Sequence, residues 1–331
     1  MAWTYDAPTG VFKDHALSSK IRENAIQRTF FARFVRPEPN YGKGRGQSIT
    51  ITRILQLGRA GRISEIETVP VVTPTIDTKA ISVSEWGVQM ELTEFQKNLT
   101  HFNIQNQYQR LLRNNMLLTV DGMCIEALNA AKLCLIPTTG SPAGVLDSDG
   151  TPSTTATANV TAATVKKAKD LLVQRGKQPF ANGRYVAAFT NTAARGLRDD
   201  AESKAWFQNT AAGGNLYTSG GIGGTDSKIP MGSAPSAEYM GRIENVDCYE
   251  VNPLSTDTLM PDLAGASTVC GNGFVFGDDA LFFAEVQKPE LRAEQPRDLG
   301  RLQAVGWVGT MEAGLVWDTA AQGNVIRITS A

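Results

Sequence analysis

The sequence is poor in the residues that most enzyme sites and metal centres use. It holds two histidines, His15 and His101, and four cysteines in 331 residues, and no two cysteines form a CxxC pair. A histidine base or a cluster of histidine ligands is therefore hard to build. The scattered cysteines fit reduced thiols better than a disulfide framework or a zinc site. No G-x-S-x-G, Walker or HExxH motif occurs, so the sequence predicts no catalytic site, metal or cofactor.

Long hydrophobic runs are also missing. No apolar stretch reaches the length of a membrane span, and the opening residues, Met1–Asp6, do not form a secretory signal. We therefore expect no membrane partner. With 42% hydrophobic residues the chain can nevertheless bury a large core. At this length a single core tends to split, which predicts two lobes.

Net charge is close to zero, but it is unevenly distributed. Residues 1–62 contain 11 Lys/Arg against 4 Asp/Glu, a balance of +7, which leaves 21 against 29, or −8, in the rest of the chain. This asymmetry predicts a basic N-terminal arm that meets acidic surface or nucleic acid. A solvated amphipathic helix would explain the same composition.

The most strongly patterned stretch is residues 103–136, which has one glycine and no proline before Pro137. Its apolar residues recur at helical spacing: Ile104, Tyr108, Leu111, Leu112, Met116, Val120, Met123, Ala127 and Ala131. The pattern predicts one long helix that Pro137 ends. A helix of this length needs a surface to lie along, and it is either an ordinary core helix or the spine of a shell-forming subunit.

Strand patterns precede this helix. Residues 48–55 alternate between apolar and polar, and residues 81–92 do so with a change of phase that suggests a bulge or bend beside Gly87. The residues between them, 56–80, are irregular and rich in Thr, Val and Ile. Such a long excursion is uncommon in a compact domain, so we expect a two-stranded arm that rests on a neighbour.

The basic segment has its own pattern. Residues 1–16 are expected to be extended, and residues 18–36 are expected to form a helix that Pro37 ends, with Phe30 and Phe34 on one side and Arg33 on another.

Towards the C-terminus, helices at 161–175 and 191–199 alternate with strands at 185–189, 243–251 and 273–276, which predicts an α/β lobe. Asp278 and Asp279 are expected to cap a short helix. Residues 305–317 and 324–328 are expected to form a closing strand pair, with Trp307 and Trp317 on an apolar face that the long helix covers.

In this order, the elements resemble the major capsid proteins of tailed bacteriophages, which have the Hong Kong 97-like fold. The stretches that carry the resemblance are TVPVVTPTIDTKAISVSEWG (68–87), YVAAFTNTAARGLRDD (185–200), GRIENVDCYEV (241–251), and GFVFGDDALFF (273–283) followed by GWVGTMEAGLVWDTAAQGNVIRI (306–328). The resemblance covers nearly the whole chain. One departure is Thr190-Asn191, where many relatives carry a histidine–proline pair.

The resemblance implies an α+β fold in four parts: an N-terminal arm (1–48), an extended β-hairpin loop (49–82), a peripheral domain with a long spine helix (83–137 and 300–331), and an axial α/β domain (138–299). It also implies hexamers and pentamers in an icosahedral virion shell around double-stranded DNA, assembled in the host cytoplasm. The expected partners are a separate scaffolding protein, a portal protein and possibly a decoration protein. Packaged DNA would be bound without sequence preference.

Two sets of residues are predicted to contact neighbouring subunits. In the arm these are Phe30, Phe31, Arg33 and Phe34, and in the excursion they are Arg59, Arg62, Glu65 and Glu67. Lys79 is the only lysine of the excursion, and the lysine–asparagine cross-link of the family's type member has no identifiable place here. An encapsulin compartment, which has the same fold but encloses protein cargo, is the alternative. An α/β enzyme with an unrecognised site is a more distant one.

Overall fold

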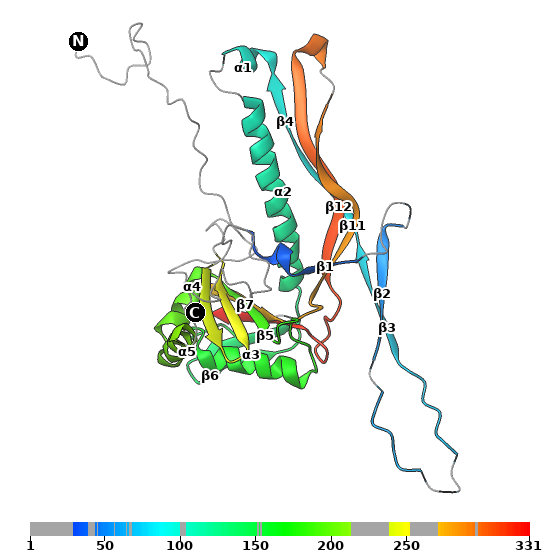
Figure 1. The fold of residues 1–331 in the computed structure, drawn as a ribbon, viewed down its shortest axis with the longest axis vertical. Helices are drawn as coiled ribbons and strands as arrows, with labels where there is room; N and C mark the ends of the chain where they lie inside the picture. The colour runs from blue at the N-terminus through cyan, green and yellow to red at the C-terminus, as the bar shows by residue number, and fades with distance from the viewer. Residues whose placement is uncertain are drawn as a thin grey trace, which may run out of the picture.

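The computed structural model describes residues 29–38, 44, 46–55, 57–63, 65, 68–99, 104–150, 152, 154–212, 238–251, 271–294 and 297–331. Their strands form a four-stranded sheet, a seven-stranded sheet and a two-stranded ribbon. Figure 1 shows the long helix α2 (Ile104–Asn129) beside the four-stranded sheet. The seven-stranded sheet and its helices lie at one end of α2, and the ribbon projects from the other side of the four-stranded sheet.

The predicted long helix exists, but it is shorter than expected. It ends at Asn129, and residues 133–138, which were expected to continue it, form the strand β5 (Leu133–Thr138). A continuous apolar run fits a strand buried on both faces as well as it fits a helix, and Leu133, Leu135 and Ile136 are all fully buried. Pro137 is accommodated because the pairing of β5 with β6 shifts register there.

The four-stranded sheet provides the surface along which α2 lies. Its strands run in the order β1 (Val35–Pro37), β11 (Leu281–Ala293), β12 (Leu302–Leu315) and β4 (Ser84–Thr93). Trp307 of β12 is 1% exposed and its indole N–H donates to Asn115 of α2 at 3.0 Å. The predicted cover of the tryptophan face by the long helix is therefore confirmed for Trp307. In contrast, the short helix predicted after Asp279 is wrong, because Asp279 turns the chain at φ 56° and Leu281 begins β11.

The seven-stranded sheet forms the predicted α/β lobe. Its order is β6 (Ser141–Asp147), β5, β13 (Val325–Ser330), β10 (Gly271–Phe276), β7 (Tyr185–Phe189), β9 (Val246–Glu250) and β8 (Glu238–Ile243). The helices α3 (Ala162–Gln174), α4 (Asn191–Asp199) and α5 (Ala201–Ala212) pack with it, and α5 was not predicted. The expected pairing of the two C-terminal strands is wrong, because β12 pairs in the other sheet while β13 pairs with β10 and β5.

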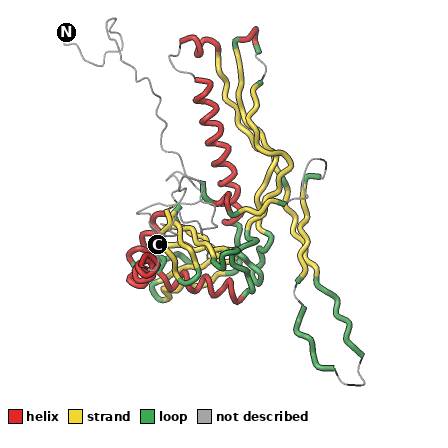
Figure 2. The backbone as a smooth tube through the Cα atoms, in the orientation of Figure 1, coloured by secondary structure: helices red, strands yellow, loops and turns green. Residues whose placement is uncertain are grey.

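The ribbon confirms the predicted two-stranded arm. β2 (Ser48–Ile54) pairs antiparallel with β3 (Ile76–Ser82), and residues 57–75 continue beyond them as an extended loop (Figures 1 and 2). The phase change in residues 81–92 has a simpler cause than the expected bulge at Gly87. One strand ends at Ser82 and the next begins at Ser84, so the chain changes sheets at Val83.

The N-terminal segment differs from its prediction. Residues 18–28 lie outside the described residues, but the end of the expected helix is a 3₁₀ turn, η1 (Phe31–Arg33), followed by the strand β1. Both phenylalanines at the turn are buried: Phe30 is 2% exposed and Phe31 is 0% exposed. Their burial against the sheet replaces the one-sided packing that a helix would need.

Phe31→Ala tests this anchoring. The Phe31 ring lies 5.9 Å from that of Phe274 and 6.5 Å from that of Phe276, so truncation leaves a cavity in the main core. We expect the free energy of unfolding to fall by about 3–5 kcal/mol, measured by urea titration. Phe95→Ala is the matched control, because Phe95 is 72% exposed and its loss should change the same quantity by less than about 0.5 kcal/mol. Equal effects for the two variants would contradict the assignment.

Candidate assembly surfaces

The described residues hold no arrangement suited to catalysis. They contain no group of three or more His, Cys, Asp or Glu side chains that could hold a metal ion. Cys124, Cys134 and Cys248 are buried free thiols, as the sequence predicted, and burial raises the pKa of Cys134 to about 11. Cys270 lies outside the described residues. None of the described helices is both long and apolar enough to cross a membrane.

The acidic pairs have structural roles instead. Asp200 accepts hydrogen bonds from the backbone N–H of Ser203 at 3.0 Å and of Ala162 at 3.2 Å, so it joins the starts of α5 and α3. Asp279 forms an ion pair with Arg36, which fastens β1 to the turn before β11. These carboxylates are used by the fold itself.

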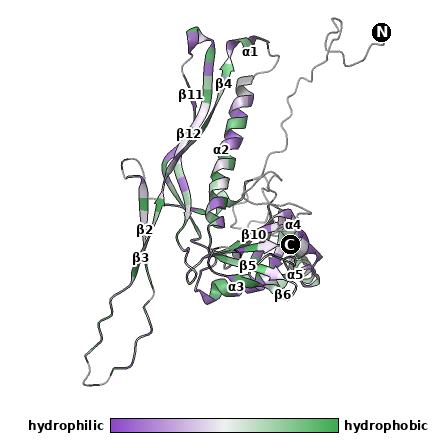
Figure 3. Cartoon of the chain, turned by 180° about the vertical axis from the view of Figure 1, so that it is seen from behind, coloured by the Kyte–Doolittle hydropathy of each residue, from purple (hydrophilic) through white to green (hydrophobic). Residues whose placement is uncertain are grey.

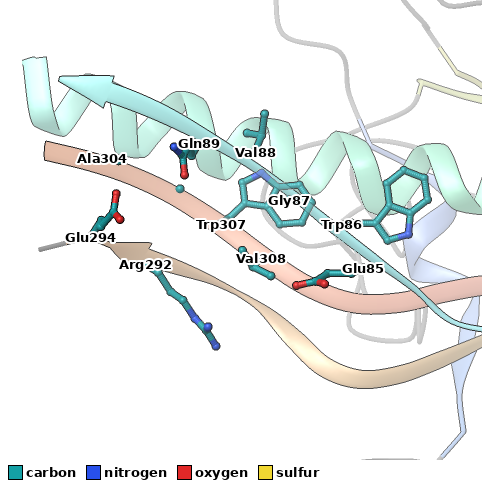
Figure 4. A pocket seen from close by; sticks show the side chains of 12 residues that line it. Glu85, Trp86, Gly87, Val88, Gln89, Arg292, Glu294, Ala304, Trp307 and Val308 are labelled. Atoms are coloured by element: carbon teal, nitrogen blue, oxygen red, sulfur yellow. The ribbon is translucent and has the colours of Figure 1, made fainter. Parts of the chain in front are cut away.

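A hollow of about 680 Å³ lies on the four-stranded sheet (Figure 4). Its floor is low because Gly87 and Gly306 face each other across β4 and β12. A Cβ at Gly87 would lie 2.6 Å from the carbonyl oxygen of Trp307, so a side chain does not fit there. Charged side chains at its rim include Glu85, Glu294 and Arg292. Without a nucleophile–base pair, this open surface is suited to contact rather than chemistry.

The predicted arm residues do not form one surface. Phe30 and Phe31 are buried in the core of their own chain, which corrects their predicted role as contacts to a neighbour. Phe34 is half-buried, with its ring 5.5 Å from Phe180 and 5.4 Å from Phe276. Arg33 is exposed, so of the four it alone presents its side chain fully to solvent. Three aromatic residues in a short segment fit an internal anchor as well as an external one, and the sequence did not distinguish these cases.

A buried carboxylate fixes the point where the arm leaves the core. Asp121 of α2 is 3% exposed, and its Oδ1 accepts hydrogen bonds from the backbone N–H groups of Phe30 and Ala32, each at 3.0 Å. Burial raises the pKa of the Asp121 carboxyl, and the donating backbone amides oppose this rise. The sequence gave no signal for Asp121, because a lone acid in a helix is ordinarily solvated.

The predicted loop residues lie together beyond the ribbon. Arg59, Arg62 and Glu65 are all exposed, and no ion pair joins either arginine to another described residue. Glu67 lies outside the described residues. The loop also exposes large apolar side chains that sequence reasoning did not single out: Leu57 (53%), Ile63 (44%), Val69 (71%), Val71 (96%) and Val72 (63%). From behind, as in Figure 3, no helix or strand of the described chain lies beside the loop. The Val-Pro-Val-Val run was the available signal.

The ribbon is attached to its own subunit at two places. Ile81 packs with Val83 and Ala284 near the start of β4. At the loop end, Arg53 pairs with Asp77 across the ribbon (Nε to Oδ2, 2.8 Å) and donates to the carbonyl of Val316. Lys79, the lysine for which no cross-link partner was identifiable, forms an ion pair with Asp318. The segment 316–318 therefore holds the ribbon where the loop begins.

Comparison with known proteins identifies the fold. No family model matches the sequence, and no curated protein matches it. The structure is similar to the capsid of Ralstonia phage GP4, with 12% identity, a TM-score of 0.65, and 99% of this chain and 98% of that chain covered. For the Cyanophage Pam1 capsid the identity is 17% and the TM-score 0.64, with 99% of each chain covered. For the head of Helicobacter pylori bacteriophage KHP40 they are 13% and 0.66, with coverage of 100% and 99%.

At these identities the likeness is one of fold, and it extends over the whole chain. The chain has the Hong Kong 97-like fold of tailed-phage capsid structures, which confirms the fold class that the sequence resemblance implied. The long helix on a sheet, the α/β lobe and the projecting ribbon are the parts of this chain that make up that fold.

The effect of Asp121 on stability should depend on pH. Because its pKa is raised above the ordinary 3.8, the group's stabilisation is fully present below that value and is lost as pH rises through the folded-state pKa. Asp121→Asn keeps an accepting oxygen without a charge. The gain in unfolding free energy of Asp121→Asn over wild type should therefore be largest near pH 7 and shrink towards about pH 4.

Urea unfolding at a series of pH values measures this difference. Asp121→Ala is the second variant, and it should lose about 1–3 kcal/mol at each pH because two buried amides lose their acceptor. A gain for Asp121→Asn that grows as the pH falls would contradict the assignment.

Proposed function

We propose that this protein is the structural subunit of a tailed-phage head, and that it assembles into a closed shell without performing catalysis. The likeness of fold to phage capsids over the full chain carries the proposal. The exposed loop supports it independently, because five large apolar side chains without cover are costly in a monomer and are buried when subunits meet.

We further propose that the chain divides as the sequence suggested. The arm covers residues 1–48, the ribbon and loop 49–82, a peripheral domain 83–137 and 300–331, and an axial domain 138–299. β5 and β13 are best counted with the seven-stranded sheet in which they pair. In this arrangement the loop reaches a neighbouring subunit within a hexamer or pentamer, and these capsomers build an icosahedral shell.

The proposed contacts to neighbours are those that solvent reaches. Arg33, Arg59, Arg62 and Glu65 supply charge, and the exposed loop valines supply apolar area. Exposed ion pairs contribute at most about 1 kcal/mol each, whereas a fully buried valine contributes about 1.5–3 kcal/mol. The valines therefore provide most of the affinity, and the charges set register and salt sensitivity.

The other proposed partners follow from a shell that packages a genome. We propose a separate scaffolding protein, a portal protein, a decoration protein and double-stranded DNA, with assembly in the host cytoplasm and a final place in the virion. DNA contact would be independent of sequence and would weaken steeply with salt, since the basic arm meets phosphates and not base edges.

Electron microscopy of particles tests the shell directly. Co-expression with the scaffolding protein encoded beside it should give closed shells tens of nanometres across, and particles from infected cells should contain DNA. Particles that enclose protein cargo without DNA would favour the encapsulin alternative. Only monomers, over a range of salt and protein concentrations, would reject the proposal.

Removing the loop separates its role in assembly from its role in folding. Replacing residues 57–73 by a short Gly/Ser linker keeps the backbone bond from Leu55 N–H to the Thr75 carbonyl, so the ribbon still closes. We expect an unchanged unfolding midpoint and loss of shells, because the loop has no core of its own. An insoluble or molten variant would show that the loop belongs to the folding unit.

Point substitutions refine this test. Val71 is 96% exposed, so Val71→Asp should leave the urea midpoint unchanged and strongly reduce shell yield, since it places a charge in a buried contact. Val71→Ile keeps the side chain apolar and should retain shells. If both variants assemble like wild type, Val71 lies outside the interface.

A further inference from the structure

The attachment of the ribbon at residues 316–318 contains an unusual group of side chains. The indole of Trp317 has two cations over it: the Arg53 guanidinium carbon lies 4.8 Å from the ring centroid, and the Lys177 ammonium lies 3.9 Å from it. These three residues come from three parts of the molecule. Arg53 belongs to the ribbon, Trp317 to the connection between the two large sheets, and Lys177 to the chain just after α3.

The two cations are not equivalent. Arg53 is 7% exposed, but its charge is balanced by the ion pair with Asp77 and its remaining N–H groups are used by the Val316 carbonyl. Lys177 has no ion-pair partner among the described residues, and it lies near Arg53 and Arg175. Burial, followed by the charges of these two arginines, lowers the pKa of Lys177 to about 8.

We propose that Trp317 is the fastening point that holds the ribbon at a fixed angle to its own subunit, and that the positive charge of Lys177 weakens this attachment. A cation over an aromatic ring is attracted by about 0.5–2 kcal/mol, and Arg53 supplies this attraction at every pH of interest. A second, unbalanced cation at the same ring adds repulsion and desolvation that exceed its own attraction. Uncharged, the Lys177 stem still covers the ring as an apolar side chain.

The other charged groups around Trp317 do not titrate in the same range. Asp77 and Asp318 are paired with Arg53 and Lys79, and carboxylates stay ionised near neutral pH. The arginines stay charged, and burial raises the pKa of Tyr185, whose hydroxyl donates to the Lys177 carbonyl, above its ordinary value of 10.0. Lys177 is therefore the group of this cluster that changes charge between pH 7 and pH 9.

Linkage gives the direction and size of the effect. A lysine whose pKa is about 8 when attached and 10.5 when released favours the attached state as pH rises. Between pH 7 and pH 9 the ratio of attached to released ribbon should rise about tenfold. Its consequence for shell formation, a ribbon aimed differently at its neighbour, rests on the proposed function, whereas the attachment itself does not.

The test measures the ribbon in the unassembled full-length subunit. Spin labels at Ile76→Cys on the ribbon and Ser148→Cys beside β6 report their separation by pulsed electron paramagnetic resonance, since both positions are accessible. Cys270 is replaced by serine, and the three buried cysteines are left in place. The expected result is a distance distribution that narrows as the pH rises from 7 to 9.

Three variants identify the residues responsible. Trp317→Leu should give a broad distribution at every pH, because the ring that both cations share is lost. Lys177→Met should be as narrow at pH 7 as wild type is at pH 9, with no pH dependence. Lys132→Met is the matched control: Lys132 is exposed and distant in sequence, so this variant should keep the wild-type pH response. Thermal unfolding confirms that each variant is folded.

Two outcomes overturn the proposal. A Trp317→Leu distribution as narrow as wild type would show that Ile81 and the ion pairs hold the ribbon without the ring. A Lys177→Met variant that keeps the wild-type pH response, or broadens at pH 7, would show that the lysine charge does not weaken the attachment. Because the readout needs no shell, a subunit that passes this test but never assembles would count only against the proposed function.

Discussion

The packing of α2 against the four-stranded sheet is the contact on which the rest of the subunit depends. Trp307 closes it from the sheet, with its indole N–H bonded to Asn115, while Leu112 and Met123 of the helix are almost fully buried in the same core. The same helix carries Asp121, which holds the start of η1, and its C-terminal end leads directly into β5 of the other sheet. One helix thus sets the positions of the arm, the long sheet and the α/β lobe.

The ribbon shows the opposite situation. Two strands followed by an extended loop bury little surface, and an isolated ribbon is marginally stable in water. This chain stabilises the ribbon at its two attachment points and leaves the loop valines exposed. A monomer gains nothing from that exposure, so the same side chains that make the loop a poor folding unit make it a suitable contact between subunits.

Charge has a related division of roles. Inside the subunit, the carboxylates of Asp77, Asp200, Asp279 and Asp318 are each matched to an arginine, a lysine or a set of backbone amides. The exposed arginines of the loop are not matched within the described chain. Electrostatics therefore fixes how the parts of one subunit are joined, while leaving charge available where subunits would meet.

The sequence by itself determined the order of elements and the type of most of them, because long periodic segments bury one face whatever surrounds them. The helix at 104–129, the strands around 48–54 and 302–315 and the α/β alternation from 162 to 251 follow from this periodicity. Only the tertiary structure decided between readings that local pattern leaves equal. Residues 133–136 became a strand because both faces are covered, and β13 left its neighbour β12 for the other sheet. Phe30 and Phe31 turned inwards because a core cavity and the Asp121 carboxylate, both distant in sequence, were there to receive them.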